Sequence, residues 1–176
     1  MIRLAGLADV DAIIALEHTA REAAHWSLAE YALILRGPEE GAALRRWSYV
    51  FESEAGSSQD GSLLGFIVVK LLRVGGEAQA EIENLAVAAT ARRRGVGSAL
   101  CRAALQRLQE EGAETVELEV RAGNSGAVEL YSRLGFETAG IRPDYYSNPK
   151  EDARLFRVHL PVPNGESAGL IMRIDG

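Results

Sequence analysis

The hydrophobic period of the chain changes at the stretch 91–100, which reads ARRRGVGSAL. Before it, apolar residues alternate with polar ones as far as Ile82 in the segment AQAEIENLAV, as in a β-strand. After it, apolar residues recur every three or four positions from Val96 to Leu108, which predicts a helix ending at Gly112. We therefore expect a strand, a tight turn and a helix in succession.

The predicted turn has the properties of an anion-binding site. The first backbone N–H groups of a helix have no partner inside the helix, and the helix dipole adds partial positive charge there. Gly95 and Gly97 carry no Cβ, so a phosphate can approach the backbone closely. The P-loop pattern GxxxxGK[ST] and the third glycine of the dinucleotide fingerprint are both absent. A solvated basic turn is the alternative that this stretch alone leaves open.

The same periods and cap residues predict the other elements. Helices are expected at 9–20, after Ser27, and at 124–135 between an Asn124 cap and Gly135. Strands are expected at 2–4, 45–53, 62–72, 115–120, 136–141 and 152–160, with loops at 54–61 and 142–151. The order predicts a mixed α/β (α+β) fold with a strand–helix–strand–helix–strand centre.

Composition limits the class of protein. The chain has 176 residues, of which 47% are hydrophobic and 25% charged, which is typical of a soluble globular protein. We expect one domain at 1–160 and a tail at 161–176. Segment 1–11 is too acidic for a signal peptide and the apolar run 61–69 is too short to cross a bilayer, so a cytoplasmic location is expected. A net charge of −6 argues against nucleic acid and membrane partners and suits a basic peptide or amine.

Cysteine and histidine residues indicate no metal and no covalent intermediate. Cys101 excludes an internal disulfide, and it falls at an apolar helical position typical of a small core residue. The three histidines, His18, His25 and His159, have no metal-ligand spacing, and HExxH is absent. The nucleophile elbow GxSxG is also absent.

Two motifs resemble those of the GNAT superfamily of N-acetyltransferases. ENLAVAATARRRGVGSALCRAAL, at 83–105, resembles its acetyl-CoA motif, and NSGAVELYSRLGFETAG, at 124–140, resembles its second motif. The resemblance extends over about residues 2–160. It implies a central, mixed, twisted sheet of six to seven strands flanked by about four helices. It also implies acetyl-CoA as co-substrate.

The resemblance also implies the residues that bind acetyl-CoA. The Val87 N–H is the expected oxyanion donor, and Asn124 is either a pantetheine ligand or a helix cap alone. The expected set is Leu85, Ala86 and Val87 along the pantetheine arm, Arg92, Arg93, Arg94, Gly95, Val96, Gly97 and Ser98 around the pyrophosphate, and Asn124.

A narrower resemblance is to the RimI-type enzymes, which acetylate the N-terminal alanine of a ribosomal protein. It is carried by HW at 25–26, LEVRAGN at 118–124, ELYSRLGF at 129–136 and IRPDYYSNPKEDA at 141–153. It implies transfer to the N-terminal α-amine of a protein. The polar insert 53–61 and the tail depart from the pattern and leave the acceptor open.

Acetyl transfer to an amine needs a proton acceptor for the amine and a proton donor for the sulfur. The RimI resemblance assigns these roles to Glu119 and Tyr131, whereas histone-type members of the superfamily favour Glu81 as the base. An exposed strand carboxylate and a core tyrosine are the alternatives for Glu119 and Tyr131.

The acceptor side is less defined by the sequence. Trp26, Tyr145 and Tyr146 fall in expected loops where such folds admit an acceptor, and the acidic residues Glu17, Glu22 and Asp144 are expected to attract a cationic amine. Two other functions stay open, namely acetylation of a small amine such as an aminoglycoside or polyamine, and a non-catalytic acetyl-CoA sensor. The resemblance is compatible with a monomer or a homodimer.

Overall fold

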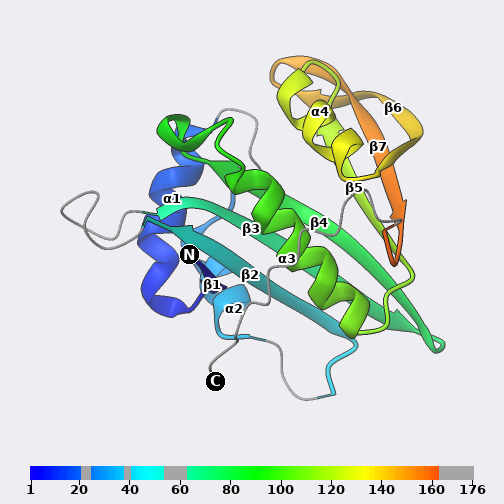
Figure 1. The fold of residues 1–176 in the computed structure, drawn as a ribbon, viewed down its shortest axis with the longest axis horizontal. Coiled ribbons are helices and arrows are strands. Elements are labelled where there is room, and N and C mark those ends of the chain that lie inside the picture. The colour runs from blue at the N-terminus through cyan, green and yellow to red at the C-terminus, as the bar shows by residue number, and fades with distance from the viewer. Residues whose placement is uncertain (21–24, 38–40, 54–62, 163–176) are drawn as a thin grey trace.

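The computed structural model describes residues 1–20, 25–37, 41–53 and 63–162. Its strands form one seven-stranded sheet in the order β1-β2-β3-β4-β5-β7-β6 (Figure 1). Among these described strands, β4 and β5 pair in parallel and the other pairs are antiparallel, so the predicted mixed sheet is confirmed. The strands are β1 (Ile2–Leu4), β2 (Leu44–Glu52), β3 (Leu63–Val74), β4 (Glu77–Val87), β5 (Thr115–Arg121), β6 (Glu137–Ser147) and β7 (Lys150–His159).

Four α-helices within the described residues cover the sheet, as predicted. They are α1 (Val10–Thr19), α2 (Leu28–Leu35), α3 (Val96–Glu110) and α4 (Ser125–Arg133), with short 3-10 turns at Leu7–Asp9 and Ala89–Ala91. The predicted caps are confirmed, because the side chains of Ser27 and Asn124 each accept a hydrogen bond from a first-turn N–H. Among the helices described, none is both long and apolar enough to cross a membrane.

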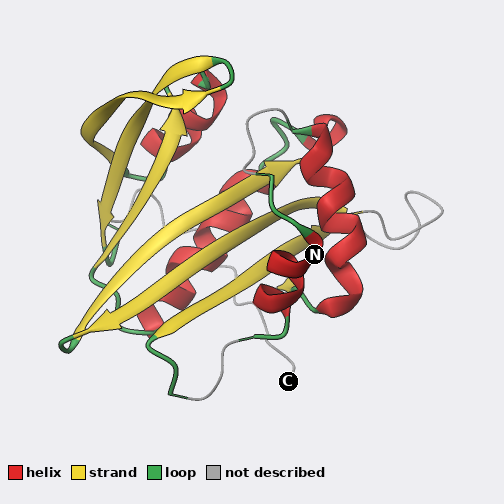
Figure 2. Ribbon diagram, turned by 180° about the vertical axis from the view of Figure 1, so that it is seen from behind, coloured by secondary structure: helices red, strands yellow, loops and turns green. Residues whose placement is uncertain are grey.

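The helices lie on both faces of the sheet. Helix α3 crosses one face, and α1 and α2 cover the other (Figures 1 and 2). Each face has its own hydrophobic core, with Leu100 in the core under α3 and Ile13 in the core under α1. Gly65 lets α3 approach β3, because a Cβ there would lie 3.0 Å from the side chains of Val96 and Leu100.

A β-bulge in β4 explains why the alternation loosens after Ile82. Val69 pairs with Ile82 and Val68 with Asn84, so Glu83 is the extra residue. Ile82 packs in the core under α3, whereas Ala86 packs in the core under α1 and α2. The bulge therefore exchanges the faces to which odd and even residues point.

The prediction of a loop at 142–151 is wrong. Strand β6 continues to Ser147, and β7 begins at Lys150, so Tyr145 and Tyr146 lie in a strand. Apolar and polar residues do not alternate here, because most of β6 is exposed and its register shifts between Arg142 and Tyr146. The loop 54–61, Glu22 and the tail from 163 onward lie outside the described residues.

Candidate active site

A cleft opens where β4 and β5 stop pairing. The two strands are paired from Ala80↔Val116 to Ile82↔Leu118, and no pair follows the bulge at Glu83. The β5–β7–β6 part and α4 diverge there from the rest of the sheet (Figure 1). The cleft has a volume of about 670 Å³, which is in the range of small-molecule sites.

The free edge of β4 supplies backbone groups to this cleft. The Ala88 N–H donates to the Leu64 carbonyl at 2.9 Å, which makes the neighbouring Gly65↔Val87 pair a non-hydrogen-bonded one. The Val87 N–H therefore points away from β3, toward the missing partner strand. Leu85, two residues earlier, has the same orientation, and residues 85–87 all line the cleft. This edge can pair with an extended ligand as a strand would.

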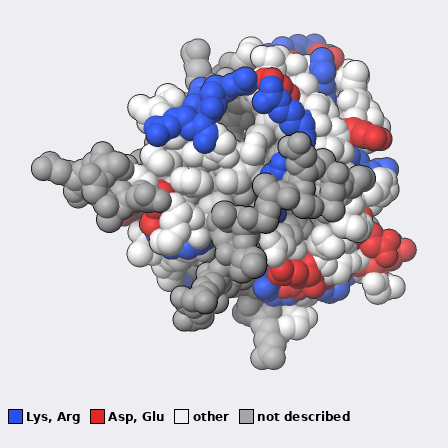
Figure 3. Space-filling model, in the orientation of Figure 1, with Lys and Arg blue, Asp and Glu red and all other residues white. Residues whose placement is uncertain are grey.

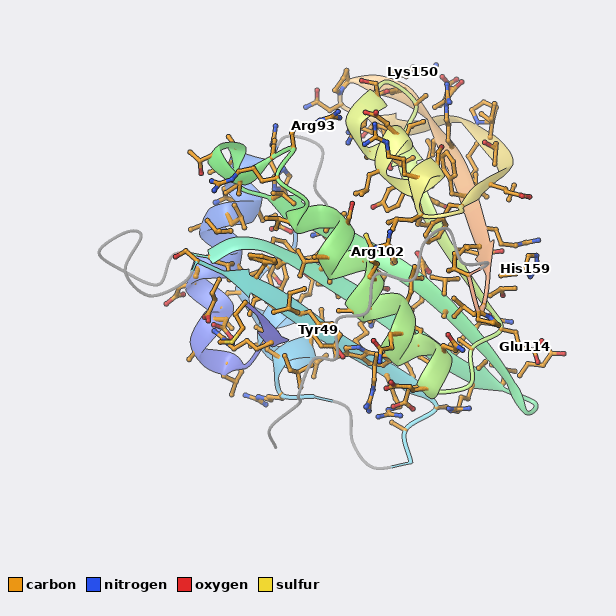
Figure 4. The ribbon with its side chains drawn as sticks, viewed as in Figure 1. Tyr49, Arg93, Arg102, Glu114, Lys150 and His159 are labelled. Atoms are coloured by element: carbon orange, nitrogen blue, oxygen red, sulfur yellow. The ribbon has the colours of Figure 1, made fainter. Side chains whose placement is uncertain are left out.

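The turn before α3 forms the mouth of the cleft. Gly95, with φ of +84°, is the N-cap of α3, and residues 95–98 line the cleft. In Figure 3 basic side chains lie on two sides of the hollow, with acidic atoms between them. Arg93 projects from this turn on the side of α4 (Figure 4) and bonds Glu129 at 2.7 Å across the mouth. Arg92 also lines the cleft and donates to the Val87 carbonyl at 3.2 Å, whereas Arg94 is exposed outside it.

Glu119 lies on β5 at the floor of the cleft. Its side chain is 22% exposed, and its Oε1 lies 3.0 Å from Nη1 of Arg142. The Tyr145 hydroxyl also donates to Glu119, and this hydrogen bond, with burial next, raises the pKa of Tyr145 to about 12. The carboxylate is therefore oriented by two groups from β6.

Tyr131 lies on α4 and also lines the cleft. It is 6% exposed, and its ring packs edge-on against Phe136 with centroids 5.5 Å apart. Burial, followed by the nearby Cys101 and Tyr146, raises the pKa of Tyr131 well above its usual value. No group in the described part of the chain hydrogen-bonds its hydroxyl. The phenol therefore stays protonated and can donate to a ligand in the cleft.

Two other carboxylates near the cleft have basic partners. Glu81 does not line the cleft and forms an ion pair with Lys70 on the neighbouring strand. Glu83, in the bulge, lines the cleft but accepts two hydrogen bonds from Arg46, at 2.7 and 2.9 Å. Of the two bases considered from sequence, the structure places only Glu119 in the cleft.

Of the residues expected on the acceptor side, some lie at the cleft and one lies outside it. Tyr146 lines the cleft and lies under the Arg121 guanidinium, which is 4.0 Å from the ring centroid. Tyr145 packs edge-on against Tyr146 and reaches Glu119. Trp26 packs against Tyr31 outside the cleft, and Asn124, which lines it, uses its side chain to cap α4 at Ala127.

A buried polar network beside the bulge was not predicted. Glu17, fully buried, accepts hydrogen bonds from the Tyr31 hydroxyl, from Asn84 Nδ2 at 2.8 Å and from the Trp26 N–H at 3.3 Å. Asn84 lines the cleft, so the network ties the bulge to α1 and α2. The only local signal is the polar residue Asn84 at a buried strand position.

Two of the acidic residues expected to attract an amine are already engaged. Glu17 is buried in this network, so the expectation that it faces an incoming amine is wrong. Asp144 forms an ion pair with Lys150 at 2.8 Å. His18 and His25 do approach Glu17, with potential ligand atoms within 4.8 Å of one another, although spacing did not predict this. Both oxygens of Glu17 nevertheless already accept hydrogen bonds from protein groups.

Comparison with known proteins agrees with this architecture. The model of the Acetyltransferase (GNAT) family matches residues 15–136. The [ribosomal protein bS18]-alanine N-acetyltransferase of Escherichia coli K12 is 34% identical over 106 residues, which are 60% of this chain and 68% of that protein. An N-alpha-acetyltransferase of Sulfurisphaera tokodaii is 40% identical over 80 residues, covering 45% of this chain and 47% of that protein.

Solved structures show the same fold. The Escherichia coli ribosomal-protein-S18-alanine N-acetyltransferase superposes with a TM-score of 0.66 at 27% identity, covering 97% of this chain and 99% of that one. The NatC complex bound to Gag peptide and CoA contains a chain with a TM-score of 0.76 at 22% identity, covering 91% and 98%. The cleft, the fold and the matched family agree, and the chain belongs to the GNAT family of acetyltransferases.

Proposed function

We propose that the protein transfers the acetyl group of acetyl-CoA to the N-terminal amine of a protein. The observation that carries this proposal is the presence of Glu119 and Tyr131 in one cleft, beside the free edge of β4 and the N-terminus of α3. The similarity to N-terminal acetyltransferases supports the choice of acceptor.

The cleft has suitable places for the parts of acetyl-CoA. Residues 95–98 offer unpaired N–H groups of a helix start for the pyrophosphate. Gly97 keeps this approach open, because an added Cβ would lie only 3.3 Å from Leu130 on the opposite wall. The β4 edge at 85–87 offers strand-like hydrogen bonds to the pantetheine amides. Acetyl-CoA brings the activated thioester that the reaction consumes.

The reaction follows from the groups that surround the thioester. Glu119 accepts a proton from the ammonium of the acceptor, and the neutral amine attacks the thioester carbonyl. The Val87 N–H donates to the oxyanion that develops on the carbonyl oxygen. As the C–S bond breaks, Tyr131 donates its proton to the sulfur, so coenzyme A leaves as the thiol. The nitrogen loses its second proton as the amide forms, and this proton returns the Tyr131 phenolate to the phenol. Tyr146, with Tyr145 packed against it, forms the side of the cleft along which the acceptor chain enters.

The test is acetyl transfer to defined acceptors. An alanine-led basic peptide, the same peptide with a blocked N-terminus, spermidine and an aminoglycoside would be compared for coenzyme A release, with the acetylated atom located by mass spectrometry. We expect turnover with the free peptide only. Faster turnover of spermidine or the aminoglycoside would contradict the proposal in favour of a small-amine enzyme. Binding of acetyl-CoA without turnover of any acceptor would indicate a sensor.

A further inference from the structure

We propose that Arg142 is a positioning residue that holds the Glu119 carboxylate in the free enzyme and yields its place to the ammonium group of the acceptor. This inference rests on the proposed function, because it concerns how that acceptor reaches the base.

The register of the sheet places Arg142 next to Glu119. On the strand between them, Ala153 pairs with Arg142 of β6 and with Arg121 of β5, two residues from Glu119. Ala153 has only a methyl side chain, which leaves room for Arg142 to reach across β7. The resulting ion pair is 3.0 Å long, and the Arg142 guanidinium lies 5.6 Å from the ring centroid of Tyr145, the other group bonded to Glu119.

Arg142 is held by fewer contacts than Arg121, another arginine near Glu119. The Arg142 side chain is 55% exposed. The Arg121 side chain is 15% exposed, bonds Glu151 and the carbonyls of Asn148 and Pro149, and stacks on Tyr146. Displacing Arg142 therefore costs one partly exposed ion pair, whereas moving Arg121 would break a group of contacts at once.

The two carboxylates near Glu119 on β4 and β5 have basic partners of their own. Glu117 bonds Arg157, and Glu83 bonds Arg46. In the part of the chain that is described, Arg142 is the cation that contacts Glu119. The other charged and titratable groups near Glu119 or along the same cleft are Glu117 and Arg121 on β5, Tyr145 and Tyr146 on β6, Glu151 and Arg157 on β7, Glu83 on β4, Arg92 and Arg93 in the turn before α3, and Glu129, Tyr131 and Arg133 on α4.

Exchange of the two cations suits the chemistry of the base. While the Arg142 guanidinium lies 3.0 Å from Oε1 of Glu119, it occupies the position that the ammonium of the acceptor must reach. An N-terminal amine has an ordinary pKa near 8, so it arrives at neutral pH largely as ammonium with the same single positive charge. Replacing Arg142 by the ammonium keeps the charge of the site constant. The proton then passes from nitrogen to Glu119 and leaves a neutral amine and a neutral acid.

The test compares Arg142→Gln with Arg142→Lys in an alanine-led peptide assay at neutral pH. In Arg142→Gln we expect KM for the peptide to fall by about two- to fivefold, the size expected for a partly exposed ion pair, because the acceptor ammonium no longer has to displace a guanidinium from Glu119. The value of kcat should stay within about twofold of wild type, because Arg142 has already left Glu119 in the bound complex. Arg142→Lys keeps the positive charge and should keep the wild-type KM and kcat.

Arg157→Gln is the matched control. It removes the same charge from an ion pair with Glu117, which lies on β5 two residues before Glu119. It should leave KM and kcat close to wild type. If kcat falls in Arg142→Gln while KM is unchanged, Arg142 stays on Glu119 through catalysis and the exchange is wrong. If neither KM nor kcat changes, or if KM rises, the positioning role is wrong while the proposed function stands. Absence of wild-type turnover with every N-terminal peptide would overturn the proposed function as well.

Discussion

Glu119 and Tyr131 line the same cleft from opposite faces of the sheet. Leu118 and Val120 pack in the same core as Tyr131, under α3 and α4, so strand alternation turns Glu119 to the other face. A thioester between the diverging strands would have a proton acceptor on one side and a proton donor on the other. The acceptor amine and the departing thiol therefore need not compete for the same space.

Replacing Glu119 by glutamine tests its role as base. Glu119→Gln keeps the shape of the side chain and removes the proton acceptor, so kcat should fall by ~10²–10⁴-fold. Acetyl-CoA affinity, measured by calorimetry, should stay close to wild type, because the substitution lies away from the turn before α3.

Glu81→Gln is the matched control for this substitution. Glu81 forms an ion pair with Lys70 outside the cleft, so its loss should leave kcat within about threefold of wild type. A large loss in Glu81→Gln with little loss in Glu119→Gln would assign the base to β4 instead.

Tyr131→Phe separates the ring of this tyrosine from its hydroxyl. The ring packing on Phe136 is retained, so the melting temperature should change little, while kcat should fall roughly tenfold or more. Because the pKa of Tyr131 is raised well above its usual value near 10, wild-type kcat should show no alkaline limb from this group below about pH 10. Normal kcat in Tyr131→Phe would make this residue part of the core only.

The elements that the sequence predicts well are those with a regular period or a cap. Strand β4 up to Ile82 and helix α3 have such periods, and Ser27 and Asn124 cap helices where expected. The first part of strand β6 is predicted, whereas the part from Arg142 to Ser147 has no such signal, because it is mostly exposed and its register shifts after Arg142. The assignment of that second part to a loop is therefore a failure of local pattern alone.

The site depends on relations that no local pattern contains. Glu81 and Glu119 are both carboxylates on alternating strands, and only the end of β4–β5 pairing places one of them in the cleft. Asn84 contacts Glu17 across 67 positions of sequence, and Arg142 reaches Glu119 across an intervening strand. Tertiary pairing decides all of these contacts.

Gly97→Asp tests the proposed pyrophosphate site. The aspartate adds a side chain and a negative charge at the start of α3, so the Kd for coenzyme A should rise at least about tenfold, which corresponds to ~1.4 kcal/mol. Gly6→Asp adds the same charge where a Cβ meets nothing within 4 Å, and should leave the Kd unchanged. Circular dichroism first confirms that both variants fold. Calorimetry then measures the Kd of each variant for coenzyme A. An unchanged Kd in Gly97→Asp would place the pyrophosphate elsewhere.

Tyr31→Phe tests the buried network through the free energy of unfolding. At pH 7 the variant removes a hydrogen bond to the buried Glu17 carboxylate, which should cost ~1–3 kcal/mol. Tyr131→Phe is the control, because no described group bonds that hydroxyl, and it should cost less.

The pH dependence of this difference follows from the pKa of Tyr31. Burial, with the bond to Glu17 next, raises the pKa of Tyr31 in the folded protein, whereas an unfolded tyrosine ionises near pH 10. Above about pH 10 the unfolded wild-type chain therefore loses a proton that the folded protein keeps, so the stabilisation is present below that pH and declines above it. Phenylalanine cannot ionise. The difference in the free energy of unfolding between wild type and Tyr31→Phe should thus become smaller when urea unfolding is repeated from pH 9 to about pH 11. A difference that stays constant over this range would mean that Tyr31 ionises equally in both states.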